Sequence, residues 1–130
     1  MLTLYGGPRT RASLPRWYME EKEISYTLIE LNRHAGENLK AEFLTINPFG
    51  KLPVLINSNI TMPNGDPLKL FESGAILLHL AEQYSNDIKT IENKALTSQW
   101  LHFANSTLSI ALFAPSHREK EFPRLMKELD

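Results

Sequence analysis

The sequence predicts an α/β fold in which a four-stranded mixed sheet carries flanking helices and is followed by a shorter all-helical segment. Three observations lead to this prediction. Over the first half of the chain, short β-rich runs alternate with helical patterns, as in a parallel strand–helix–strand crossover. Asn64-Gly65 separates two further β-rich runs, which indicates an antiparallel hairpin. After the polar break at residues 85–89, apolar residues recur every three to four positions, as in a long amphipathic helix.

The first four expected elements lie before residue 47. They are a strand at residues 2–5, a helix at 10–22, a strand at 25–31 and a short helix at 39–46. A Gly-Gly-Pro sequence ends the first strand. Pro15 is tolerated only in the first turn of a helix, so it places the start of the first helix between Thr10 and Ser13.

The later elements begin with a hairpin and continue as helices. They are a strand at residues 52–57, a turn at 63–67, a strand at 68–71, a largely buried helix at 72–84, a long helix carrying Leu96, Trp100, Phe103, Thr107 and Ala111, and a charged helix at 118–130. Pro115 is expected to end the long helix and Pro123 to interrupt the last one. This order gives a thioredoxin-like domain over residues 1–86 and a partial helical domain over residues 87–130.

Composition argues against several functional classes. With 42% apolar and 22% charged residues the chain is an ordinary globular one, and its net charge of -1 gives no general attraction for nucleic acid or an anionic membrane. No apolar run approaches the roughly 20 residues that span a bilayer. The first residues lack the pattern of a secretory signal. We therefore expect a cytoplasmic protein that binds neither nucleic acid nor membrane.

The chain contains no cysteine. This excludes disulfide bonds, a protein thiolate as nucleophile and the Cys-x-x-Cys redox chemistry of thioredoxins. The four histidines show no metal-ligand spacing, so we expect no metal site.

The stretch KLPVL places Pro53 at the start of a strand, where its missing N–H is tolerated. If the Leu52–Pro53 bond is cis, the chain turns sharply there and leaves the N–H and C=O of Leu52 facing outward. Strand-edge groups of this kind can pair with an added peptide. The alternative is a strand that simply begins after a loop.

The stretch FESGAI opens a helix with Glu72 and Ser73. Backbone N–H groups and the positive end of the helix dipole attract anions at such a position. The serine can bind a carboxylate while the glutamate holds an ammonium group, so together they suit the α-amino and α-carboxylate groups of one amino acid. The alternative is ordinary helix capping.

NPFGKLPVL (residues 47–55) followed by LFESGAILLHLAEQY (70–84) resembles the glutathione-site signature of the cytosolic glutathione transferases. The resemblance covers residues 1–86, including LYGG, and continues less specifically through SQWLHFANSTL (98–108). LYGGPRTRAS and GENLKAEFLTINPFGKLP look most like short bacterial, chi-type members such as those of cyanobacteria.

The resemblance implies a thioredoxin-like fold with a cis bond before Pro53. It implies that Leu52 pairs through its backbone with the cysteinyl part of glutathione, and that Glu72 and Ser73 hold the γ-glutamyl end. Near the glycyl carboxylate it places Lys51 and, with it, Asn38 or Lys40. Glutathione is then the co-substrate, and no other cofactor is implied.

In this family the residue that activates the thiol lies in the loop between the first strand and the first helix, commonly as Tyr, Ser or Cys. Here that loop reads GGPRTRAS and departs from the pattern, with Thr10 and Arg11 at about the family positions. We expect Arg11 and Thr10, acting with the helix dipole, to favour the thiolate ahead of Ser13 and Tyr5. A guanidinium keeps its proton, so the role of Arg11 is electrostatic. The alternative is a solvated basic helix start.

These features favour a detoxifying glutathione transferase that adds the glutathione thiolate to small hydrophobic electrophiles or reduces hydroperoxides. Two alternatives stay open: a non-catalytic module that binds glutathione or apolar ligands, and an interaction domain with a transferase-like fold.

Residues 87–130 are fewer than the family's usual helical second domain. Either the acceptor site is open, or a partner subunit completes it, or the chain is a shortened form. Trp100, Phe103 and Leu112 cannot all be buried within so small a segment, which predicts a homodimer.

Overall fold

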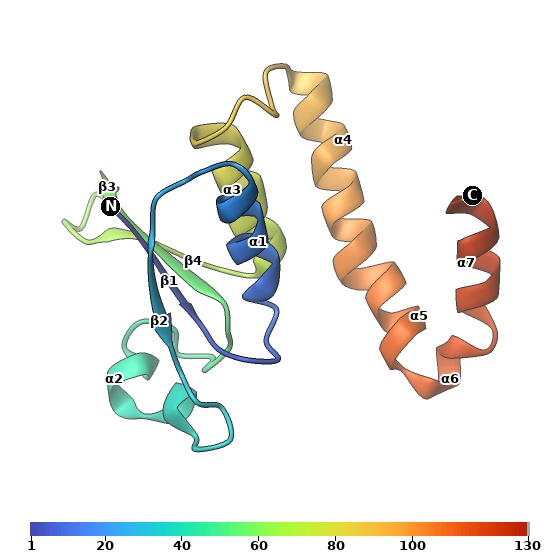
Figure 1. The fold of residues 1–130 in the computed structure, drawn as a ribbon, viewed down its shortest axis with the longest axis horizontal. Coiled ribbons are helices and arrows are strands. Elements are labelled where there is room, and N and C mark those ends of the chain that lie inside the picture. The colour runs from blue at the N-terminus through green and yellow to red at the C-terminus, as the bar shows by residue number, and fades with distance from the viewer. Residues whose placement is uncertain (130) are drawn as a thin grey trace. The chain divides into compact units, whose positions relative to one another are not determined.

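Two compact units make up the chain in a computed structural model, which describes residues 1–129. The first unit is residues 1–86, and the second begins at Asp87. The first holds the sheet and the second is helical, as Figure 1 shows. No helix within residues 1–129 combines the length and the apolar character that crossing a membrane requires. Asp130, the last residue of the expected final helix, lies outside the described residues.

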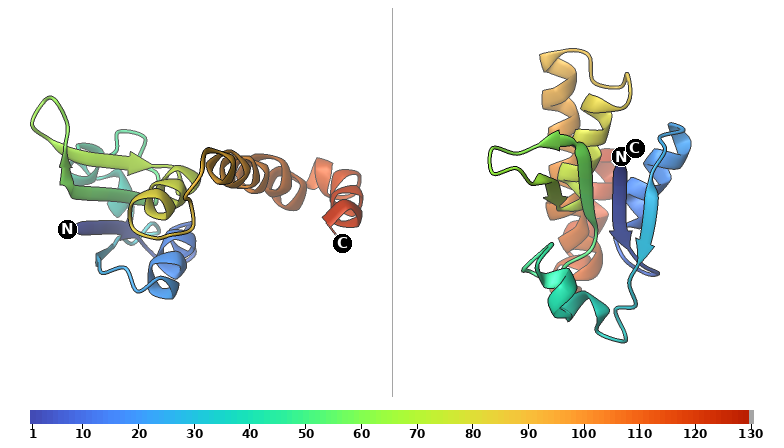
Figure 2. Two further views of the ribbon diagram at one scale, coloured as in Figure 1. Left: turned by 90° about the horizontal axis from the view of Figure 1, so that it is seen from above. Right: turned by 90° about the vertical axis from the view of Figure 1, so that its left-hand side faces the viewer.

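The elements of the first unit are, in order, β1 (Leu2–Gly6), α1 (Ser13–Glu21), β2 (Thr27–Glu30), α2 (Ala41–Leu44), β3 (Val54–Thr61), β4 (Pro67–Phe71) and α3 (Ser73–Gln83). The strands lie in the order β2-β1-β3-β4, side by side in the right-hand view of Figure 2. β1 runs parallel to β2 and antiparallel to β3, and β4 forms an antiparallel hairpin with β3. The expected four-stranded mixed sheet of a thioredoxin-like fold is confirmed.

One hydrophobic core joins the sheet to α1 and α3. Its buried members are Leu2, Leu4, Met19, Leu55, Ile76 and Leu80. Burial of each of the larger side chains stabilises the fold by about 2 kcal/mol. Side chains alternate between the faces of a strand, so Tyr5 lies on the face opposite Leu4. There its ring centroid is 5.7 Å from that of Phe43 in α2.

Two elements of the first unit differ locally from expectation. The helix expected at residues 39–46 is divided into a 3-10 turn at Glu37–Leu39 and α2, because the intervening Lys40 is extended (φ -72°, ψ 150°). The strand expected from Leu52 starts at Val54, because the intervening proline has no N–H to offer a ladder.

The second unit consists of α4 (Ile91–His102), a π-helical turn (Phe103–Leu108), α5 (Ser109–Phe113), α6 (Pro115–Arg118) and α7 (Glu121–Leu129). The first three form one continuous helical run, as expected for the long helix (Figure 1). Thr90 caps this run: its Oγ1 accepts a hydrogen bond from the N–H of Asn93 at 3.2 Å.

Two prolines act as boundaries in the second unit. The long run ends before Pro115, as expected, because Ala114 is extended and Pro115 then occupies the first position of α6. The expected interruption at Pro123 is wrong. α7 begins at Glu121, so Pro123 lies in its first turn, where a backbone N–H has no intrahelical acceptor to lose.

A buried side-chain amide on β3 determines which ring nitrogen of a histidine on α3 carries no proton. Asn57 is fully buried, and its Oδ1 accepts a hydrogen bond from the N–H of Asn59 at 3.0 Å. Its Nδ2 lies 3.1 Å from Nε2 of His79. An amide nitrogen only donates, so Nε2 is the unprotonated acceptor. Burial lowers the pKa of His79 below its usual 6.5, and the nearby Glu82 carboxylate opposes this shift only in part.

We predict that His79 contributes to acid destabilisation. Its folded pKa lies below the unfolded value, so the stability that depends on neutral His79 is present above pH 6.5 and is lost as the pH falls toward the folded pKa. His79→Gln keeps an acceptor for Asn57 but does not titrate. Its free energy of unfolding, measured in urea between about pH 7.5 and about pH 5.5, should therefore fall less than that of the wild type. Parallel pH dependences would contradict this role.

Candidate functional site

Strand pairing brings three segments that the sequence analysis singled out to one end of the sheet. Val54, the first residue of β3, pairs with Tyr5 of β1 on one side and with Phe71, the last residue of β4, on the other. The loop after β1, the Leu52–Pro53 bond and the Glu72–Ser73 pair therefore all lie at this end.

A buried asparagine shapes the loop that precedes β3. Asn47 is fully buried, and its Nδ2 donates to the carbonyl of Lys51 at 2.9 Å. Its Oδ1 accepts from the N–H of Phe49 at 3.2 Å, and its carbonyl accepts from the N–H of Gly50 at 2.9 Å. Gly50 has φ +61°, and a Cβ there would lie 2.8 Å from a leucine side chain, so this turn requires glycine. Asn47 was not among the residues expected at the site, although the Asn-Pro-Phe-Gly turn was a visible signal in the sequence.

The residues expected near the glycyl carboxylate of glutathione differ in what they contact. Asn38 supports the same loop, because its Nδ2 donates to the carbonyl of Gly50 at 2.7 Å. Lys51 and Lys40 are exposed. The ammonium groups of these two lysines are therefore better placed than the Asn38 amide to attract an anion from solvent.

The Leu52–Pro53 bond is cis, as the resemblance implied. Both sheet ladders begin at Val54, so the backbone N–H and C=O of Leu52 lie outside them. Backbone groups at such a strand edge can pair with an extended peptide.

Glu72 and Ser73 connect β4 to α3 at a cost in stability. Glu72 has φ +70° and ψ 118°, which side chains rarely adopt and which costs about 1–3 kcal/mol. Ser73 is 2% exposed, and its Oγ has no hydrogen-bond partner among residues 1–129. A buried hydroxyl without a partner costs about 1–3 kcal/mol. Both features are unfavourable for folding alone and indicate a ligand at the N-terminal end of α3.

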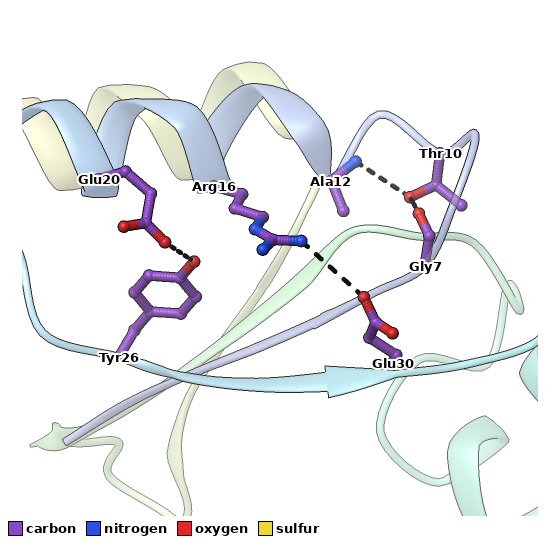
Figure 3. A network of polar contacts seen from close by, with 7 residues as sticks. All are labelled: Gly7, Thr10, Ala12, Arg16, Glu20, Tyr26 and Glu30. Carbon is purple, nitrogen blue, oxygen red and sulfur yellow. Dashed lines mark hydrogen bonds and ion pairs between the residues drawn. The ribbon is translucent and has the colours of Figure 1, made fainter.

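The loop between β1 and α1 is closed by its own hydroxyl groups. Thr10 Oγ1 donates to the carbonyl of Gly7 at 2.8 Å and accepts from the N–H of Ala12 at 3.3 Å (Figure 3). The Ser13 hydroxyl donates to the carbonyl of Thr10 at 3.2 Å. Both hydroxyl protons are thus used within the loop. Arg11 is exposed beside the N-terminal end of α1, where its charge adds to the positive end of the helix dipole.

The site as a whole offers an exposed backbone edge, a carboxylate, a buried hydroxyl and a positively charged helix start. Such a set suits a small peptide with an amino-acid head group and one group that is stabilised as an anion. Among residues 1–129, no three His, Asp or Glu side chains gather in a way that could hold a metal ion.

Comparison with known proteins relates the chain to one family. Residues 1–82 match the family model described as glutathione S-transferase, N-terminal domain. The disulfide-bond oxidoreductase YfcG of Escherichia coli K12 is 37% identical over 102 residues, which cover 78% of this chain and 47% of that protein. Glutathione S-transferase GstB of the same bacterium is 35% identical over 115 residues, 85% of this chain and 52% of that protein. The chain thus spans about half the length of these relatives.

Solved structures show the same relationship. A glutathione transferase from Pseudomonas putida, with one glutathione disulfide bound per subunit, matches with a TM-score of 0.70 and 29% identity over 95% of this chain and 56% of its own. A mutant of poplar glutathione transferase F1 matches with a TM-score of 0.73 and 28% identity, covering 99% of this chain and 66% of its own.

Ser73→Ala is predicted to stabilise the protein without ligand. The substitution removes a buried hydroxyl that has no hydrogen-bond partner among the described residues, so the free energy of unfolding should rise by about 1 kcal/mol. Ser25→Ala, at an exposed serine before β2, is the matched control and should change stability by less than about 0.5 kcal/mol. Urea unfolding measures both, and a Ser73→Ala protein less stable than the wild type would show that the hydroxyl contributes to the folded state.

Proposed function

This chain belongs to the glutathione S-transferase family, and we propose that it binds glutathione at the sheet end formed by Leu52, Glu72 and Ser73. The observation that carries the proposal is the unpaired hydroxyl of Ser73 next to the strained Glu72. A γ-glutamyl group complements both residues. Its α-carboxylate accepts hydrogen bonds from Ser73 and the first N–H groups of α3, and its α-ammonium group pairs with the Glu72 carboxylate.

The rest of the tripeptide extends along the loop before β3. Its cysteinyl residue pairs with the backbone of Leu52 as an added strand, and Pro53 keeps this edge outside the sheet ladders. Lys51 attracts the glycyl carboxylate, while Asn38 acts on that end only through the loop that it supports. Residues 1–86 are then the glutathione-binding domain. Relatives whose structures contain glutathione or its disulfide support this assignment.

We assign activation of the thiol to positive charge rather than to a hydroxyl. Thr10 and Ser13 use their hydroxyl protons within the loop and so position it. Arg11 and the N-terminal end of α1 lower the pKa of the glutathione thiol. The thiolate sulfur attacks an electrophilic carbon of a small hydrophobic substrate. A carbon–sulfur bond forms, the leaving group departs with its electron pair, and the thiol proton passes to solvent.

A second candidate reaction is the reduction of disulfides. One relative is named as a disulfide-bond oxidoreductase, and another structure contains glutathione disulfide. This chain has no cysteine, so glutathione supplies the sulfur. One glutathione thiolate attacks the substrate disulfide to give a mixed disulfide and a released thiolate. A second glutathione then releases the other substrate thiol and leaves as part of glutathione disulfide. Reduction of hydroperoxides by the same thiolate stays a prediction.

We also propose a cytoplasmic homodimer that associates through the second unit. Leu96, Trp100 and Phe113 are 55, 52 and 72% exposed, and exposed apolar side chains that gather on one surface often mark an interface. Sedimentation at micromolar concentration should give twice the mass of the chain, and Trp100→Glu should shift the protein toward monomer. A wild-type monomer under these conditions would exclude the dimer.

Glutathione binding, measured by calorimetry, tests the site directly. Ser73→Ala and Glu72→Gly should each weaken binding about tenfold or more, because each removes a group that contacts the γ-glutamyl end. Neither should lose stability, since the first removes an unpaired hydroxyl and the second relieves a φ of +70°. Ser25→Ala and Glu21→Gly are matched controls and should bind glutathione as the wild type does.

Turnover with 1-chloro-2,4-dinitrobenzene and with a small disulfide then separates the candidate functions. Conjugation of the aryl halide supports the transferase, and reduction of the disulfide supports the second reaction. Binding without either reaction indicates a non-catalytic glutathione-binding module. Affinity that is unchanged in the Ser73 and Glu72 variants would overturn the proposed site.

A further inference from the structure

A cavity at the β2 edge of the sheet is formed by the loop after β2 and by Pro8 and Arg9 of the loop after β1. It measures about 490 Å³, within the range of small-molecule sites. Its walls include Pro8, Arg9, Glu30, Leu31, Arg33 and Glu37. β2 and β4 are opposite edges of the sheet, and the cavity includes neither residue that connects β4 to α3.

Two arginines present unused hydrogen-bond donors to this cavity. Within residues 1–129, neither the guanidinium of Arg9 nor that of Arg33 has a hydrogen-bond or ion-pair partner. A guanidinium stays protonated and offers a planar fork of N–H donors. The two side chains come from different loops, one after β1 and one after β2, and line the same cavity.

Each of the two carboxylates in the same wall has a partner on one of its oxygens. Glu37 Oε2 accepts a hydrogen bond from the N–H of Asn32 at 2.6 Å. Glu30 Oε1 forms an ion pair with the guanidinium of Arg16 (Figure 3), and the two groups are 3.9 Å apart. One oxygen of each carboxylate therefore has a partner outside the pair of arginines.

Close contacts fix both loops that form the walls. A Cβ on Gly7 would lie 2.4 Å from the carbonyl oxygen of Leu31, so glycine is needed for the loop after β1 to reach the end of β2. Asn32 Oδ1 accepts from the N–H of Ala35 at 3.1 Å and closes the other loop. Arg9 itself has φ +56°, a strained conformation of the kind that gathers at ligand sites.

We propose that this cavity binds a small organic anion. A phosphate or carboxylate group lies between the guanidiniums of Arg9 and Arg33, whose forks match the oxygens of either group. The apolar body of the ligand packs against Pro8 and Leu31. None of the residues that line the cavity is proposed to hold glutathione, but Arg9 belongs to the same loop as Thr10 and Arg11.

Two naphthalene probes test the site in the full-length chain. 1-Naphthyl phosphate and 1-naphthoate are titrated into ¹⁵N-labelled protein and followed by NMR, with neutral 1-naphthol as the uncharged control. The largest shifts are expected at Arg9 and at residues 31–34, and 1-naphthol should bind about tenfold more weakly or not at all. The probe with the higher affinity identifies phosphate or carboxylate as the preferred group.

Arg33→Ala and Arg9→Gly should each weaken binding of the better probe about tenfold, while Lys120→Ala, at an exposed lysine in the second unit, should not. Arg9→Gly also relaxes a positive φ, so its melting temperature should not fall and lost binding cannot reflect unfolding. Glutathione affinity should be unchanged in Arg33→Ala. Absence of saturable shifts at about 10 mM of either probe, affinity unchanged in both arginine variants, or shifts centred on residues 72–74 would overturn the proposal.

Discussion

Most of the proposed site depends on the pairing of Val54, the first residue of β3, with the two neighbouring strands β1 and β4. Val54 pairs with Tyr5 on one side and Phe71 on the other, so the register of β3 decides which loops meet Leu52. A shift of one residue would turn the fully buried Leu55 out of the core and reverse every side chain of the strand. Burial of the core therefore fixes the register, and the same register assembles the site.

The groups assigned to the γ-glutamyl end are unfavourable to the stability of this fold. Glu72 holds a φ that suits glycine, and the buried hydroxyl of Ser73 has no hydrogen-bond partner in the part of the chain that the structure describes. The loop before β3 is the opposite case, since the buried side chain of Asn47 has a partner on both its nitrogen and its oxygen. A well-satisfied loop thus presents the backbone edge, while the strained junction keeps polar groups available for a ligand.

Local rules made much of the fold predictable from sequence. The Asn-Gly turn predicted the hairpin, and Pro53 indicated the start of β3, although the strand begins at Val54 rather than at the expected Leu52. The hydrogen bonds of Asn47 and Thr10 were not predicted, although they are local side-chain to backbone bonds of the kind that these residue types form in turns. The expected interruption at Pro123 was wrong because the sequence pattern does not show that a helix begins at Glu121. A proline in the first turn is compatible with the helix that follows.

The most direct test of the central claim is the pKa of the thiol in bound glutathione, followed through the thiolate absorbance near 240 nm as the pH is raised. If Arg11 and the start of α1 act on the sulfur, the bound thiol should titrate below about pH 7.5 rather than near 8.5, and Arg11→Ala should move it back toward the free value. A bound thiol that titrates at the free value in the wild type would contradict activation by this loop.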